Sequence, residues 1–374
     1  MKKLIIILLI LSFSCTLLSC SGSTSNSYTG ENLSDYNKCL NYVKKNAKNP
    51  TDYLVNKLNE NSIVILGEMH EMQDNLDFIS KNMSKFYYEG GVRIFASEFV
   101  RSHNNKAINE IVTAKEFDYN RVVALYRDFA WLWGYKGYID IIESIWKLNL
   151  GLGADEEKMK IVGLDFEWQD WSGAEVESSE EYRDEYMADM FINAYGDGNY
   201  GKAIIHTGFN HSFFDFQEYG KRMGYYLNQK YGNKLFQICL HHNYSLYAGA
   251  AKEDIEDFYI STFIDNIYHG NGNNPIGFDI IGSPFENMKD NVSDFFKHDD
   301  YTVLSTITEG YIVLKALPDI KSTPYVDNFI DESNFKKAKE IIRTRRWFEF
   351  KDYISIDELN KKLSRFMNKQ DGEN

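Results

Sequence analysis

Proline and cysteine are scarce in this chain of 374 residues, with five and four copies. So little proline excludes a proline-rich linker, and so little cysteine excludes a dense disulfide framework. Tyrosine and phenylalanine are abundant, with 26 and 25 copies. This composition favours an ordered, aromatic-rich core over a disordered chain.

Positive charge is also in short supply. The chain has 41 basic and 55 acidic residues, for a net charge of −14. A protein that binds nucleic acid needs positive charge to neutralise phosphates, and no basic stretch here alternates with aromatic residues. We therefore expect no nucleic acid partner, and a small molecule or a peptide as the ligand or substrate.

The chain has no apolar run long enough to span a membrane. Its first residues include two lysines, followed by a short apolar run. This pattern predicts a signal peptide over residues 1–19, too short to read as a spanning helix. The "LLSC" at 17–20 resembles a bacterial lipobox, which implies lipidation of Cys20. We expect a flexible tether over 20–32 and a lipid anchor in the cell envelope, at the outer membrane or cell surface rather than the inner membrane. The alternative is an ordinary secretory signal with a chance cysteine.

Two cysteines, Cys39 and Cys239, remain in the mature chain. They could pair in an oxidising compartment, or they could be two buried free thiols. The sequence leaves both alternatives open.

Short apolar runs alternate with amphipathic stretches from residue 62 onward. The runs predict strands at 62–67, 92–99, 160–166, 202–208, 234–242, 277–282 and 309–317. Helices are expected at 31–60, after the first strand, and at 104–149, 178–195, 213–231, 333–346 and 356–368. This alternation predicts an α/β fold with a mostly parallel central sheet and helices on both faces. We expect a single domain over 33–330, followed by C-terminal helices over 331–374.

Ionisable residues follow the predicted strands, at the edge where ligands bind in parallel α/β sheets. If the first strand stays extended beyond Gly67, the side chains of Glu68 and His70 point to the same side. Each of His70 and His211 comes three residues after a glycine that ends a strand, whereas His206 lies within a strand and is expected in the core. The other residues at strand ends are Glu98, Asp165, Glu167, His241 and His242.

Several familiar motifs are missing. The chain has no GxSxG, which argues against a serine-hydrolase triad. It has no GxGxxG and no GxxxxGK[ST], which argues against dinucleotide or P-loop nucleotide binding. Without HExxH or paired CxxC motifs, neither a zincin nor a structural zinc site is indicated.

The motifs that are present resemble a known superfamily. "ILGEMHE" at 65–71 and "HTGFNHSF" at 206–213 are similar to the paired GxxH motifs of the ChaN-like haem-binding and Tiki superfamily, which shades into the erythromycin esterases. "ASEF" at 96–99 resembles the glutamate of the second strand in that superfamily. Further similar segments lie at 133–149, 161–167, 223–238 and 309–317, so that the resemblance spans about 60–317.

The resemblance implies a site at the strand ends but no single activity. ChaN-like members bind haem at a lipoprotein surface, Tiki-like members are metal-dependent proteases, and erythromycin esterases open a lactone with water activated by histidine and glutamates. Glu68 and His70 are two residues apart, which is the ChaN and Tiki spacing. The stretch "EMQDNLDF" lacks the second downstream histidine expected of many ChaN-like sequences.

Two hypotheses follow. The first is a hydrolase with Glu68, His70, Glu98 and His211 as catalytic residues. They would hold a divalent Mn, Co, Zn or Fe, or His70 would act as a general base without metal. Asp165, Arg101 and Trp133 are expected at the substrate, with Arg127 as another candidate for the positive group. The second hypothesis is a haem-binding lipoprotein of the ChaN type, with a histidine or tyrosine as axial ligand and tryptophans stacked on the ring. For Trp133 the alternative is ordinary core packing.

Overall fold

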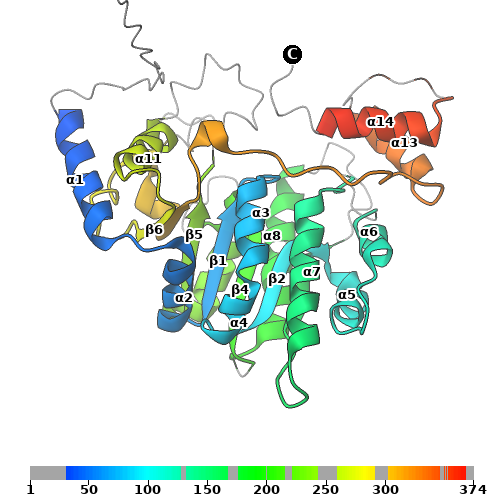
Figure 1. Ribbon diagram of the computed structural model, residues 1–374, viewed down its shortest axis with the longest axis horizontal. Coiled ribbons are helices and arrows are strands. Elements are labelled where there is room, and N and C mark those ends of the chain that lie inside the picture. Colours follow the sequence, from blue (N-terminus) through cyan, green and yellow to red (C-terminus); the bar gives the residue numbers. More distant parts are fainter. Residues whose placement is uncertain are drawn as a thin grey trace, which may run out of the picture.

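A seven-stranded sheet forms the centre of the molecule, with the strand order β3-β2-β4-β1-β5-β9-β6 (Figure 1). The computed structural model describes residues 31–127, 132–166, 176–198, 200–214, 221–242, 259–290, 302–345, 349, 351 and 353–367. The signal peptide and Cys20 lie outside these residues, and so do Glu167 and most of the tether.

All strands of the sheet are parallel to their neighbours except the last. The parallel strands are β1 (Ile63–Glu68), β2 (Val92–Arg101), β3 (Lys160–Asp165), β4 (Lys202–Gly208), β5 (Leu235–Leu240) and β9 (Gly310–Val313). The edge strand β6 (Ile276–Asp279) pairs with β9 in the antiparallel sense. A separate two-stranded sheet joins β7 (Lys289–Asp290) to β8 (Thr302–Val303). The predicted fold, a mostly parallel sheet, is confirmed.

Helices cover both faces of the sheet, as predicted. Alternate residues of β1 enter different cores, because successive side chains of a strand point to opposite faces. Val64 and Leu66 pack with α2 (Pro50–Glu60), α3 (Gln73–Lys81), α4 (Met83–Tyr88) and α7 (Lys136–Gly151). Ile63 and Ile65 pack with α8 (Val176–Tyr195) and α9 (Met223–Tyr231). The central strands are thus buried on both sides, which explains their continuous apolar sequence.

A third apolar cluster lies beside β6 and β9. It includes residues of α1 (Glu31–Asn46) and α11 (Tyr259–Gly270). Cys39 and Cys239 both lie buried in this cluster and do not form a disulfide, which agrees with the second of the two alternatives. Burial raises the pKa of Cys39 to about 12, which leaves this thiol protonated and unreactive.

Two of the predicted helices are shorter than expected. The stretch 104–149 is divided among α5 (Asn105–Val112), α6 (Tyr119–Arg127) and α7. The helix expected from residue 213 begins at α9, because a 3-10 turn, η2 (Phe209–Ser212), follows β4 and Phe213 is extended. Side-chain periodicity does not reveal such breaks, because the apolar residues on either side of them are buried in the same way.

The C-terminal helices pack onto the main core. Buried residues of α13 (Phe335–Arg345) and α14 (Ile356–Met367) join the same apolar cluster as α6 and α7. The chain reaches them through an extended segment, drawn in orange above the sheet in Figure 1. We call its residues 321–326 the strap.

The strap joins two loops at the carboxyl end of the sheet. The amide of Thr323 donates to the carbonyl of Glu71 over 2.7 Å, and the amide of Gln73 donates to Lys321 over 2.8 Å. On its other side, the strap bonds with the segment that carries Trp133, through Val326 to Gly134 at 2.7 Å. The loop after β1 and the loop before α7 are thereby held together.

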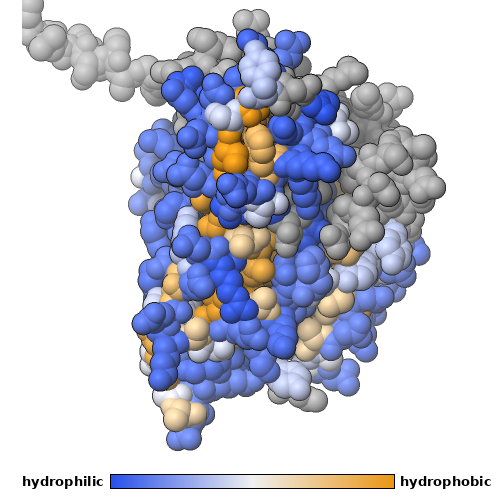
Figure 2. Space-filling model, turned by 90° about the vertical axis from the view of Figure 1, so that its right-hand side faces the viewer, coloured by the Kyte–Doolittle hydropathy of each residue, from blue (hydrophilic) through white to orange (hydrophobic). Residues whose placement is uncertain are grey.

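The face shown in Figure 2 is mostly hydrophilic, with hydrophobic side chains gathered in a narrow band. Within the part of the chain that the structure describes, no helix is both long and apolar enough to cross a membrane.

Candidate functional site

Glu68 is the last residue of β1 and lies at the centre of a hydrogen-bond network. Its Oε1 accepts from the Tyr138 hydroxyl at 2.6 Å and lies 3.3 Å from His70 Nδ1. Its Oε2 lies 2.7 Å from His206 Nε2. Burial raises the pKa of this carboxyl, but His206 and His70 outweigh burial, and the pKa lies below its usual value. An ionised carboxylate only accepts, so both histidines donate to Glu68.

His70 is held with its two nitrogens in different surroundings. Its Nδ1 faces Glu68, and its Nε2 faces Gly208, where a Cβ atom would come within 3.2 Å of it. Burial lowers the pKa of His70, but the hydrogen bond to Glu68 and the charge of Glu98 outweigh burial, so the pKa is raised. The side chain is 20% exposed, whereas that of Glu68 is fully buried. A ligand can therefore reach His70 but not Glu68.

Aromatic rings surround His70. The rings of Phe99 and Trp133 lie edge-on to it, with centroids 5.4 and 5.2 Å away. Phe99 and Trp133 are stacked on each other at 5.5 Å. Trp133 thus lies beside His70, and it also packs against the main core.

Glu98 lies on β2, next to the end of β4. Its Oε2 accepts from the Thr207 hydroxyl at 2.9 Å and from the Gly208 amide at 2.7 Å. Its Oε1 accepts from Arg183 at 2.7 Å. Burial raises the pKa of Glu98, but the neighbouring His211 ring and the Arg183 guanidinium outweigh burial and hold the pKa well below its usual range.

Arg183, on α8, connects the remaining residues of the site. Its guanidinium donates to Glu98, to Asp165 Oδ1 at 2.9 Å and to His211 Nε2 at 2.9 Å. Burial lowers the pKa of Arg183, and the carboxylates of Asp165 and Glu98 raise it by more, so the group is charged. Three of the five N–H groups of a guanidinium are used in these bonds.

The orientation of His211 follows from Asp184, the neighbour of Arg183 on α8. Asp184 Oδ1 lies 2.7 Å from His211 Nδ1 and also accepts from the Met223 amide at 2.8 Å. Arg222 pairs with the other oxygen of Asp184, at 3.3 Å. Because Asp184 is fully buried and accepts these bonds, we infer that Nδ1 of His211 carries a proton and Nε2 accepts from Arg183.

Four strands and the segment before α7 therefore bring together six of the seven expected site residues: Glu68, His70, Glu98, Trp133, Asp165 and His211. Arg101 is buried in β2 and donates to the carbonyl of Phe166, away from this network. Arg127 pairs with Asp331 and donates to Phe329 O, on a different part of the molecule. The positive group of the site is Arg183.

The predicted metal-ligand set of His70, His211, Glu68 and Glu98 does not form. Both oxygens of Glu68 and both oxygens of Glu98 already accept hydrogen bonds. The Arg183 guanidinium stands at His211 Nε2, where a metal ion would have to bind. Among the residues described, no group of three or more His, Cys, Asp or Glu is placed to hold a metal ion.

Sequence reasoning missed Arg183 and Asp184, and placed His206 in the core without a role. His206 is buried, as predicted, but it also donates to Glu68. Arg183 and Asp184 lie on α8, which packs against β3. In the sequence they could have been noticed only as a pair of opposite charges close to apolar residues that are buried.

The strand-end histidines after β5 belong to other contacts. His241 bonds with Asp265 at 2.9 Å and with the Tyr311 hydroxyl at 3.0 Å. His242 lies 2.8 Å from the carbonyl of Leu240, and burial lowers its pKa to about 4.

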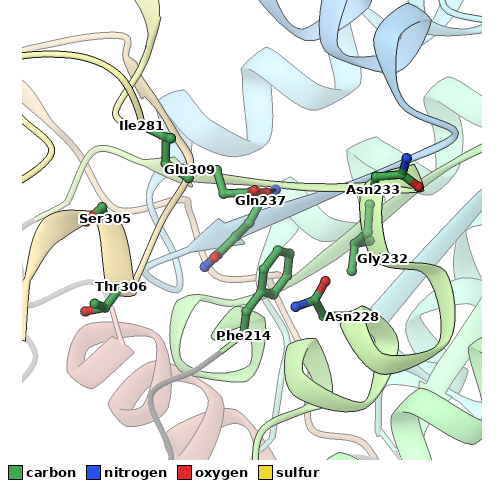
Figure 3. Close-up of a pocket in the computed structure, with 10 residues that line it drawn as sticks. Phe214, Asn228, Gly232, Asn233, Gln237, Ile281, Ser305, Thr306 and Glu309 are labelled. Atoms are coloured by element: carbon green, nitrogen blue, oxygen red, sulfur yellow. Dashed lines mark hydrogen bonds between the residues drawn. The ribbon is translucent and has the colours of Figure 1, made fainter.

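A cavity of about 310 Å³ lies away from this network, near the start of β5 (Figure 3). Its lining includes Phe214, Gln237 and Glu309, and none of the site residues named above. The Gln237 amide donates to Ser212 Oγ at 2.7 Å and to Ile307 O at 2.6 Å. Gln237 thus anchors the 3-10 turn η2, which carries His211.

Comparison with known proteins supports the fold. No protein-family model matches the sequence, and no curated protein matches it. A structure described as a succinoglycan biosynthesis protein matches with a TM-score of 0.57 and 12% identity, over 77% of this chain and 98% of that chain. A Bacillus cereus protein matches with a TM-score of 0.53 and 11% identity, over 79% and 99%. At these identities the likeness shows the fold alone.

The structural neighbours also include ChaN of Campylobacter jejuni, described as binding haem cofacially. The match has a TM-score of 0.36 and 15% identity, over 51% of this chain and 86% of that chain. A TM-score at this level supports no conclusion about the site. The assignment to the ChaN and Tiki superfamily therefore stays a prediction.

Proposed function

We propose that this protein is a hydrolase that activates water with His70 to cleave an ester or an amide. The observation that carries the proposal is the pairing of His70 Nδ1 with Glu68 at 3.3 Å. Glu68 is itself fixed by Tyr138 and His206. This arrangement fixes the tautomer of the imidazole and leaves Nε2, which lies beside Gly208, as the basic atom.

The reaction would proceed by addition of water. His70 Nε2 takes a proton from water as the oxygen attacks the carbonyl carbon. The carbonyl oxygen becomes an oxyanion, which needs a positive group nearby. When the tetrahedral intermediate collapses, the C–O or C–N bond breaks, and His70 returns the proton to the leaving oxygen or nitrogen. The imidazolium formed in between is stabilised by ionised Glu68.

Arg183 is the group best placed to stabilise the oxyanion. Hydrogen bonds to Glu98, Asp165 and His211 hold its guanidinium in place, and two of its N–H groups are not used in those bonds. We assign His211 and Glu98 to positioning this guanidinium rather than to proton transfer. Asp165, expected at the substrate, would act through Arg183 in the same way.

We infer that the mechanism needs no divalent metal. The guanidinium occupies the position between His211 and Glu98 that a bridging cation would need, and it supplies the positive charge directly. Fixed donors of this kind are effective because they need not reorganise during the reaction.

Haem binding is the second candidate. The exposed part of His70 and the stacked rings of Phe99 and Trp133 would serve an axial ligand and its aromatic surroundings. Under this alternative the buried Glu68 has no chemical task. Glu68→Gln would then leave haem affinity nearly unchanged, whereas under the hydrolase proposal it lowers turnover by about 10²–10⁴-fold with the fold intact.

We also propose that the protein is held at the cell envelope by a lipid on Cys20. The support is the lipobox-like "LLSC" and the polar residues that follow it. The region described here, from α1 onward, would then be joined to the membrane by the short predicted tether.

Metal content and haem titration test the proposed class. Protein purified without a metal-affinity tag is assayed for bound metals by mass spectrometry, beside His70→Ala, and hydrolysis is assayed with and without a chelator. We expect no stoichiometric metal, and turnover that the chelator does not change. A stoichiometric metal that is lost in His70→Ala would contradict the metal-free mechanism. Stoichiometric haem binding without turnover would favour the second candidate.

A further inference from the structure

Glu71, the residue after His70, has an unusual backbone. Its φ is 70°, in the left-handed region that residues other than glycine seldom adopt. Two contacts hold it there: its carbonyl accepts from the Thr323 amide of the strap at 2.7 Å, and its amide donates to the Tyr138 hydroxyl at 3.1 Å. Strain of this kind persists when the surroundings enforce it, and it is concentrated at functional sites.

The carboxyl of Glu71 is only partly satisfied. Its Oε2 is enclosed and has no hydrogen-bond partner among the described residues. Burial raises the pKa of this carboxyl, while a hydrogen bond from Tyr135 and the charge of His70 lower it less. No lysine or arginine of the described chain is among the groups that shift it. A buried carboxylate is normally paired with a cation, and the described residues supply none to this group.

Aromatic rings lie beside Glu71, and one of them, that of Trp133, also has a polar atom without a hydrogen-bond partner among the described residues. The Trp133 ring lies 5.3 Å from Tyr135, whose hydroxyl bonds Glu71, and 5.2 Å from His70. Tyr325 of the strap packs edge-on to Tyr135 at 5.4 Å. Trp133 Nε1 is also buried without a partner among the residues described. A carboxylate next to Trp and Tyr rings is the combination that recognises organic ammonium groups.

We propose that Glu71 and Trp133 form the part of the site that recognises a substrate with an organic ammonium group. The ammonium would pair with Glu71 and lie against the Trp133 ring, which would place the rest of the substrate at His70. This inference rests on the proposed hydrolase, because it names the class of substrate for the same site.

The charge of the site favours a cation over an anion. Five acidic side chains lie around it, Glu68, Glu71, Glu98, Asp165 and Asp184, against the two arginines Arg183 and Arg222. The arginines pair with carboxylates on β3 and α8. The excess of negative charge therefore lies on the side of His70. The whole chain, with a net charge of −14, attracts the same kind of ligand.

Binding of choline and of its neutral carbon isostere, 3,3-dimethylbutan-1-ol, tests the proposal by isothermal titration calorimetry. The two ligands have the same shape and differ in charge. We expect choline to bind at least about tenfold more tightly than the isostere, which corresponds to one charge-assisted contact. Glu71→Gln should lower choline affinity to that of the isostere and leave isostere affinity unchanged.

Asp77→Asn is the matched control. It removes the same charge from the same segment, but Asp77 is already paired with Lys81 at 2.7 Å. We expect wild-type choline affinity in this variant. Trp133→Phe should weaken choline binding by several fold because Phe is the weaker partner for a cation, and near-ultraviolet circular dichroism checks that each variant folds.

The outcomes separate the two proposals. Equal affinity for choline and its isostere, or binding of neither, would overturn this inference even if neutral esters are hydrolysed. Selective choline binding that Glu71→Gln abolishes would support it even if no ester is hydrolysed, in which case the proposed hydrolase is wrong. Equal loss of choline affinity in Asp77→Asn would show a long-range charge effect and also overturn the inference.

Discussion

Glu68 is a carboxylate that three side chains approach and that solvent does not reach. Tyr138 and His206 bind it at 2.6 and 2.7 Å, which leaves the longer contact of 3.3 Å to His70. Removal of the charge would leave two buried donors without an ionised acceptor, at a cost of about 1–3 kcal/mol each. The residue therefore contributes both to stability and to the orientation of His70.

The raised pKa of His70 gives a prediction for pH dependence. His70 acts as a base only when it is neutral, so kcat/KM should fall as pH drops through its pKa. Because the carboxylates raise that pKa above 6.5, we expect the inflection above pH 6.5. Glu68→Gln removes the hydrogen bond that raises the pKa, and the inflection should move to lower pH.

Hydrolysis of p-nitrophenyl acetate, measured from about pH 5 to pH 9, tests this prediction. Rates in Asp77→Asn should show the wild-type inflection, since Asp77 lies outside the network. An unchanged inflection in Glu68→Gln would mean that a group other than His70 is titrating.

At the scale of elements, the site depends on two glycines that let the ends of β1 and β4 come close. A Cβ on Gly67 would lie 2.8 Å from Ser212 Oγ, and a Cβ on Gly208 would lie 2.7 Å from His70 Cε1. The GxxH motifs thus place a histidine after each strand and also remove the side chain that would block the other strand.

Gly208→Ala should reduce turnover by about 10–100-fold, because the methyl group displaces His70 from its position. The control is Gly151→Ala, where a Cβ meets nothing within 4 Å. This second variant lies at the end of α7 and should gain about 0.5–1 kcal/mol of stability with wild-type turnover. Thermal unfolding and ester hydrolysis are measured on both. Wild-type turnover in Gly208→Ala would contradict the placement of His70.

The strands of the sheet were predictable from the sequence, whereas the contacts of α8 were not. The strands β1 to β5 could be predicted because they are short continuous apolar runs, and parallel order at once places Glu68, Glu98 and His211 at one edge. Arg183 and Asp184 could not be predicted, because their approach depends on how α8 crosses the sheet, and helical periodicity does not give that. Arg101 was misjudged for a related reason: β2 continues to residue 101, beyond the predicted end at 99, so the arginine stays buried in the strand.

At the scale of the whole molecule, segments distant in sequence complete the site. The strap comes from residues 321–326, yet it holds the loop with Glu71 against the loop with Trp133. The C-terminal helices fix the far end of this segment by joining the main core. A change in the packing of α13 or α14 would therefore move the strap, and with it the loops that carry Glu71 and Trp133.

Membrane attachment is a property of the whole chain that Cys20 should determine. We expect metabolic labelling with radioactive palmitate, and recovery of the protein in the membrane fraction. Cys20→Ser should abolish the labelling because the thiol and its lipid are lost, while Cys39→Ser, which changes a buried thiol, should retain it. Absence of label in the wild-type protein would make the lipoprotein prediction wrong.

The most direct test of the central claim is hydrolysis of p-nitrophenyl acetate by wild-type protein, His70→Ala and Glu68→Gln. The account predicts turnover in the wild type, loss of about 10²–10⁴-fold in His70→Ala, the range for removal of a general base, and a comparable loss in Glu68→Gln with the fold intact. Retained turnover in either variant, or none in the wild-type protein across a panel of activated esters, would contradict it.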